Sequence, residues 1–105
     1  MKMLTKSIES KLPKLRAETT EDSPVLVHYF NPVGRGHWFG MTYDPKERLF
    51  FGYVSLFGDW NDELGYFSLD ELESIELPLG MKIERDLHWD DTKTLKEVKE
   101  RYTHG

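Results

Sequence analysis

Four histidines, His28, His37, His88 and His104, are the side chains of this 105-residue chain that could transfer a proton or bind a metal near neutral pH. No two of them have the HxH, HxxxH or HExxH spacing that places two ligands on one face of a strand or helix. The chain has no cysteine, which excludes disulfides, thiolate nucleophiles and cysteine-bound zinc. We therefore expect no metal and no cofactor, with His28 a partly buried strand residue and His88 a structural hydrogen-bonding residue.

Two acids flank a base at Glu84-Arg85-Asp86, and paired carboxylates of this kind could serve in acid–base catalysis. A strand with salt-bridged charges on its solvent face explains the same residues without any pocket. An enzyme would need a pocket in which His28, His88, Asp86 and Arg85 converge. We favour a non-enzymatic protein and keep a small hydrolase-like enzyme with this His/Asp site as an alternative.

Two loop segments partly resemble ligand-binding motifs. The segment from Asp59 to Glu63 (DWNDE) is acidic, as calcium loops are. An EF-hand loop needs Gly at its sixth position and Glu at its twelfth, and the chain has Leu64 and Asp70 there. The segment 34–36 (GRG) is too short and too weakly basic to cradle a phosphate. We interpret both segments as turns.

The net charge of −5 is unevenly distributed along the chain. Residues 1–17 carry five bases against one acid, whereas residues 49–76 carry seven carboxylates and no Lys or Arg. The seven carboxylates are Asp59, Asp62, Glu63, Asp70, Glu71, Glu73 and Glu76. Neutralising nucleic-acid phosphates requires clustered Lys and Arg, so we do not expect direct binding of DNA or RNA. Trp60 lies inside the acidic loop and either packs on the sheet edge or anchors a partner protein.

The elements that must position these residues form an α+β fold with an antiparallel sheet of about five strands and three short helices. Apolar and aromatic runs predict strands at 25–30, 38–43, 49–55, 64–67 and 81–87, with the first three joined by short turns as a meander. The strand at 25–30 is apolar on both faces and should be covered on both sides. One domain over residues 1–105 is expected, and the absence of a long apolar run favours a cytoplasmic protein without a membrane span.

Local signals place the three helices. The N-terminal helix should end near Lys11 or Leu12, because Pro13 cannot occupy a regular helix interior. Two capping-box patterns, SLDE at 68–71 and TLKE at 94–97, predict a helix after the fourth strand and a C-terminal helix.

Four segments resemble a bacterial family catalogued as domain of unknown function 2958 (DUF2958). They are LTK…KLPKL at 4–15, LFFGYV at 49–54, ELGYFSLDELES at 63–74 and PLGMKIERDLHW at 78–89, in the order that the family has. The resemblance implies a short protein without assigned catalytic residues, carried by phages, plasmids and integrative conjugative elements. The loop at 57–62 is particular to this sequence, so a function located there would not follow from the family.

The resemblance and the charge distribution together favour a small counter-defence inhibitor of the anti-CRISPR type. Its expected partner is a protein with a basic nucleic-acid-binding surface, such as a Cas9-type nuclease, which an acidic surface would block. The predicted partner-binding residues are Asp59, Trp60, Asp62, Glu63, Glu71, Glu73 and Glu76. An accessory protein of plasmid or conjugative-element maintenance, binding DNA through the N-terminal helix, remains a further alternative.

Overall fold

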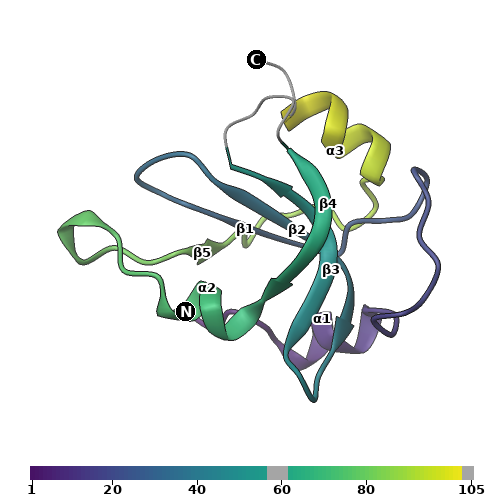
Figure 1. Cartoon of the computed structure of the whole chain (residues 1–105), viewed down its shortest axis with the longest axis horizontal. Coiled ribbons are helices and arrows are strands. Elements are labelled where there is room, and N and C mark those ends of the chain that lie inside the picture. Colours follow the sequence, from purple (N-terminus) through teal and green to yellow (C-terminus); the bar gives the residue numbers. More distant parts are fainter. Residues whose placement is uncertain (57–61, 103–105) are drawn as a thin grey trace.

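A five-stranded antiparallel sheet in the order β4-β3-β2-β1-β5 is the centre of the computed structural model, which describes residues 1–56 and 62–102 (Figure 1). The elements are α1 (Lys6–Lys11), β1 (Val27–Phe30), β2 (His37–Asp44), β3 (Leu49–Ser55), β4 (Glu63–Ser68), α2 (Leu69–Ser74), the 3-10 turn η1 (Pro78–Gly80), β5 (Glu84–Arg85) and α3 (Leu95–Tyr102). The predicted α+β fold with five strands and three helices is confirmed. No helix within the described ranges is both long enough and apolar enough to cross a membrane.

The first three strands form the predicted meander, β4 extends it beside β3, and the fifth strand returns to the opposite edge beside β1. The strand expected over 81–87 is much shorter in the structure, where only Glu84 and Arg85 pair with β1. Ile83, which precedes the strand, is buried in the core at 4% exposure. The Asp86 amide still donates to the His28 carbonyl oxygen at 2.8 Å. This bond fixes Asp86 beside the middle of β1.

The predicted helix limits are confirmed by their caps. Helix α1 ends at Lys11, two residues before Pro13. Ser68 Oγ accepts a hydrogen bond from the Glu71 amide at 3.2 Å and starts α2. The capping box before α3 is complete, because Thr94 Oγ1 accepts from the Glu97 amide and the Glu97 carboxylate accepts from the Thr94 amide. Local sequence chemistry therefore determines where these helices begin and end.

The core lies on both faces of the sheet, in two clusters. One cluster lies beneath α1 and α2 and contains Tyr29, Phe50, Phe67, Leu69 and Leu72 among its buried residues. The other lies beneath α3 and contains Val25, Phe39, Met41, Tyr53, Leu95 and Val98. Strand β1 is buried on both faces, as its composition predicted. Its α3-facing side carries His28, which is 4% exposed.

Candidate functional site

A chain of hydrogen-bonded side chains joins Asp86, His28 and His37 on the α3 side of the sheet, with His28 buried and the other two partly exposed. His28 Nδ1 lies 2.9 Å from Asp86 Oδ2, and His28 Nε2 lies 2.8 Å from His37 Nδ1. The His28 ring also stacks on Phe39 with ring centroids 4.6 Å apart. Strand pairing creates this arrangement, because β1 and β2 are adjacent and Asp86 follows directly after β5. We call these three residues the histidine relay.

Burial and hydrogen bonding decide the protonation states within the histidine relay. Burial lowers the pKa of His28 to about 4, although the hydrogen bond to Asp86 opposes this shift. Partial burial also lowers the pKa of His37, with the charge of Asp62 acting in the opposite direction. Burial alone would raise the pKa of Asp86, but hydrogen bonds from His28 and the His88 amide prevail and lower it. At pH 7 the relay therefore contains one carboxylate and two neutral imidazoles.

These charge states fix the tautomers of both rings. An ionised carboxylate only accepts, so the proton of neutral His28 must lie on Nδ1, which faces Asp86. His28 Nε2 is then an acceptor, and His37 must donate to it from Nδ1. Neutral His37 consequently has an unprotonated Nε2. Such a nitrogen can accept a proton, and the imidazolium formed would be stabilised through His28 by the Asp86 charge.

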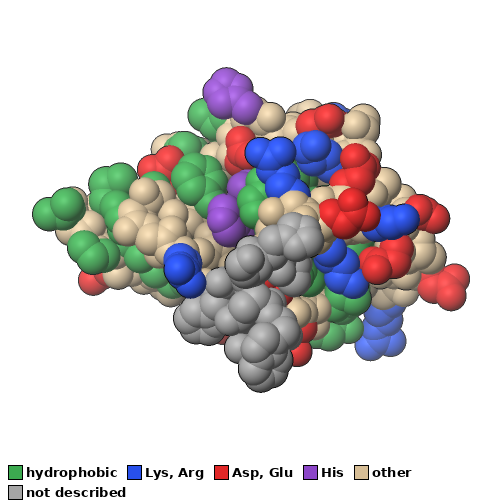
Figure 2. Space-filling model, turned by 90° about the horizontal axis from the view of Figure 1, so that it is seen from above, with side chains coloured by type: hydrophobic (Ala, Val, Ile, Leu, Met, Phe, Trp, Pro, Cys, Tyr) green, Lys and Arg blue, Asp and Glu red, His purple; other side chains and the backbone are tan. Residues whose placement is uncertain are grey.

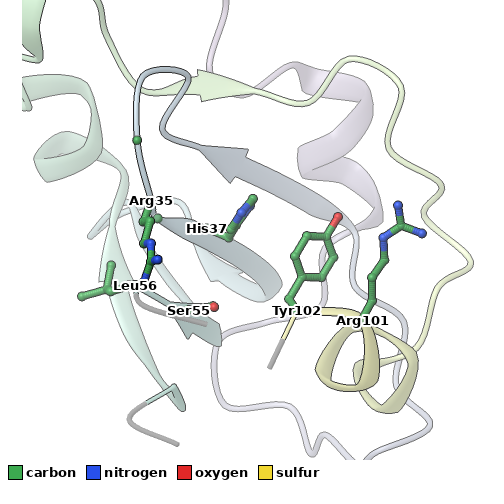
Figure 3. A pocket seen from close by; sticks show the side chains of 8 residues that line it. Arg35, His37, Ser55, Leu56, Arg101 and Tyr102 are labelled. Atoms are coloured by element: carbon green, nitrogen blue, oxygen red, sulfur yellow. The ribbon is translucent and has the colours of Figure 1, made fainter. Parts of the chain in front are cut away.

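His37 lies at the wall of a cavity of about 280 Å³ between the β1–β2 turn, the end of β3 and the C-terminus of α3 (Figure 3). The lining residues are Gly34, Arg35, Gly36, His37, Ser55, Leu56, Arg101 and Tyr102. Figure 3 shows the His37 side chain between Arg35 and Tyr102, with Arg35 directed toward Ser55 and Leu56. The histidine relay thus connects the partly exposed Asp86 carboxylate to a polar cavity at the surface.

The structure brings together only part of the His/Asp site that the sequence suggested. Asp86 and His28 are in contact, but Arg85 Nε donates to the backbone oxygen of Lys2, away from His28. His88 contributes only its amide, which donates to Asp86 Oδ1 at 3.0 Å, and its side chain is exposed. His37 was not in the predicted set. The alternation of His37 with Phe39 along β2 was the signal that both side chains share one face.

The carboxylates of residues 49–76 differ from one another in their surroundings in the folded protein. Arg48, at the start of β3, donates to Asp70 Oδ1 and to Glu73 Oε1, both at 2.7 Å. Asp62 Oδ2 accepts from the buried Ser55 hydroxyl at 2.6 Å. Glu63, Glu71 and Glu76 are exposed, and no ion pair to any of these three is found among the described residues. Asp59 and Trp60 lie outside the described residues, as does His104.

Strand β4 presents apolar side chains beside these exposed acids. Among the described strands it pairs only with β3, and it therefore forms one edge of the sheet. Tyr66 is 64% exposed and Leu64 is 42% exposed.

Viewed from the α3 end, the molecule shows acidic and basic side chains interspersed across the surface (Figure 2). No group of three or more potential His, Cys, Asp or Glu metal ligands occurs in the parts of the chain that the structure describes.

A sequence profile for the family described as "Protein of unknown function (DUF2958)" matches residues 2–102. The chain belongs to the DUF2958 family. The match includes the whole sheet, all three helices and every residue of the histidine relay. No curated protein and no solved structure matches the chain. The DUF2958 assignment therefore establishes kinship and names no activity.

Proposed function

We propose that this DUF2958 protein is a non-enzymatic inhibitor that binds a partner protein through the free edge of its sheet. The binding surface consists of Glu63, Leu64, Tyr66, Glu71 and Glu76, and we call it the β4–α2 surface. The observation that supports it most strongly is an edge strand with an exposed tyrosine beside exposed carboxylates. Large aromatic side chains with a polar rim are typical of binding hot spots.

The shape of the β4–α2 surface suits an extended basic partner. Six residues of strand span about 17–20 Å, so Glu63 and Glu71 lie toward opposite ends of β4. A surface that long can follow a basic nucleic-acid channel, and carboxylates along it would accelerate association at low salt. Asp62 and Glu73 contribute less in this arrangement, because each already accepts a hydrogen bond from a neighbouring side chain.

The partner we propose is a defence nuclease of the Cas9 type. Mobile-element cargo, which the family resemblance implies, meets such nucleases on entering a host. A Cas9-type nuclease holds its heteroduplex in a positively charged channel. A small acidic protein seated at that channel would exclude guide or target nucleic acid, so inhibition requires neither a catalytic site nor a cofactor in the inhibitor.

Charge reversal on the β4–α2 surface should weaken binding to the nuclease by about tenfold at low salt. The variant is Glu63→Lys with Glu76→Lys, because Glu71 lies in the first turn of α2, where a positive charge would destabilise the helix. The control, Glu18→Lys with Glu100→Lys, changes the net charge equally at exposed acids elsewhere.

The measurement is inhibition of DNA cleavage when the protein is titrated into the nuclease before or after the guide is loaded. The control variant should inhibit as wild type does, and high salt should reduce the difference between the two variants. Equal inhibition by both variants would refute docking through the β4–α2 surface. A wild-type protein that fails to bind the nuclease even at low salt would refute the choice of partner.

A further inference from the structure

We propose that the cavity beside His37 is a binding site for a protonated oxyanion of the phosphate class, with His37 Nε2 accepting the ligand's proton. The site lies at the C-terminal end of α3 and contains none of the residues of the β4–α2 surface. The inference therefore does not depend on the proposed inhibitory function. It assigns a role to the histidine relay, which has no role in the proposed binding of a partner protein.

The relay provides a proton acceptor of fixed orientation. His37 Nδ1 is occupied by its bond to His28, so Nε2 is the nitrogen through which His37 can meet a ligand. Among the residues that the structure describes, none forms a hydrogen bond with this Nε2. Asp86 Oδ2 accepts from His28 Nδ1 at the other end of the chain, so a proton arriving at Nε2 is stabilised without any rotation of either ring.

The other groups at the cavity suit a small anion that still carries a proton. Arg35 and Arg101 line the cavity, and Arg101 lies over the Tyr102 ring with its guanidinium carbon 5.8 Å from the ring centroid. Figure 3 shows Arg101 on the side of Tyr102 away from His37, so Arg35 is the cation that lies on the side of His37 and matches the negative oxygens of an oxyanion. Asp62, held by Ser55, carries a negative charge near His37 and would repel an anion that has no proton to share.

The cavity is also large enough for such an ion. A cavity of about 280 Å³ has room for several water molecules and therefore for a phosphate group.

A comparison of phosphate with sulfate distinguishes recognition of a proton on the ligand from simple attraction between opposite charges. Both are tetrahedral oxyanions of similar size, but at pH 7 phosphate retains a proton and sulfate has none. A site that depends on His37 as an acceptor should prefer phosphate, whereas a site built only on the charge of Arg35 should bind both ions. Methyl phosphate, whose second pKa is about 6, should bind better at pH 6 than at pH 7.5.

The test is a titration of the full-length protein with inorganic phosphate, followed through the imidazole ¹⁵N signals by NMR. Phosphate should shift the His37 signals and raise the His37 pKa, and sulfate at equal ionic strength should do so about tenfold less effectively. His37→Gln should weaken phosphate binding by about tenfold, whereas His88→Gln, at an exposed histidine, should leave it unchanged. If methyl phosphate binds and inorganic phosphate does not, the ligand is a phosphomonoester.

Three outcomes would overturn the proposal. Equal shifts of the His37 signals with phosphate and with sulfate would show that the site recognises only the charge of the ligand. Phosphate-induced shifts at other residues with none at His37 would place the ion elsewhere. Absence of any shift at high concentrations of both inorganic phosphate and methyl phosphate would show that the cavity does not bind this class of ligand. The ligand comparison uses the wild-type protein, so it decides the question even if His37→Gln fails to fold.

Discussion

Gly52→Ala should destabilise the fold by at least about 3 kcal/mol, measured as a lower midpoint of urea unfolding. Gly52 lies in β3 opposite Gly40 of β2, next to the register shift between Gly40 and Thr42. A Cβ added at Gly52 would overlap the carbonyl oxygen of Phe39. Because the obstacle is backbone rather than a flexible side chain, the two central strands would have to separate.

Gly65→Ala is the matched control for this substitution. Gly65 of β4 is the register partner of Gly52 on the other side of β3, and a Cβ there meets no atom within 4 Å. Removing a glycine from a strand also reduces the entropy of the unfolded chain, so Gly65→Ala should be neutral or stabilising by up to about 1 kcal/mol. Equal losses for both variants would contradict the packing described for β2 and β3.

Acidification from pH 7 to pH 4 should cost the fold roughly 3 kcal/mol through His28. Burial holds the pKa of His28 at about 4 in the folded protein, against about 6.5 in the unfolded chain. Below pH 6.5 the unfolded state therefore binds a proton that the folded state does not. Stability falls as the pH decreases from about 6.5 to about 4, and the lowered pKa of His37 contributes in the same direction.

Urea unfolding at several pH values, together with an NMR titration of the imidazoles, measures this dependence. His88→Gln should retain the full loss, because this side chain is exposed and outside the histidine relay. His28→Gln should be less stable at pH 7 but should lose less on acidification. Constant stability between pH 7 and pH 4 would show that His28 is not held in its neutral form.

Much of the fold follows from local sequence chemistry. The end of α1 before Pro13 and the starts of α2 and α3 were predictable because capping and proline geometry depend on neighbouring residues. The strand at 49–55 was predicted at its observed limits because its apolar run is bounded by a turn on one side and the acidic loop on the other. The short β5 was not predictable, because its limits depend on pairing with β1, which is far away in the sequence.

The candidate sites depend on contacts between distant residues, which are harder to predict from the sequence. The stretch 49–76 has no base of its own, yet Arg48 pairs with Asp70 and Glu73 because Leu49 lies opposite Ser68 across the β3–β4 hairpin. Knowing the register of the β3–β4 hairpin would have been enough to predict this contact. The histidine relay is harder to foresee, since Asp86 reaches His28 only when the chain after α2 returns to the β1 edge.

Two different surfaces of one sheet are thus assigned different roles. The edge at β4 combines exposed apolar and acidic side chains, which suits a protein partner. The α3 side encloses a relay of polar residues within aromatic packing, which suits a small ligand. Substitutions at Glu71 or Glu76 should leave the cavity unaffected, whereas Glu63 directly follows Asp62, whose charge acts on His37.

Hydrogen exchange of this protein alone and in complex with a guide-free Cas9-type nuclease tests the central claim most directly. In the free protein, β4 pairs on one side only, so amides on its open side should exchange rapidly. Binding through the β4–α2 surface predicts slower exchange across β4 and α2, with little change in α1. Protection confined to α1, or to the cavity at the end of α3, would contradict the proposed mode of inhibition.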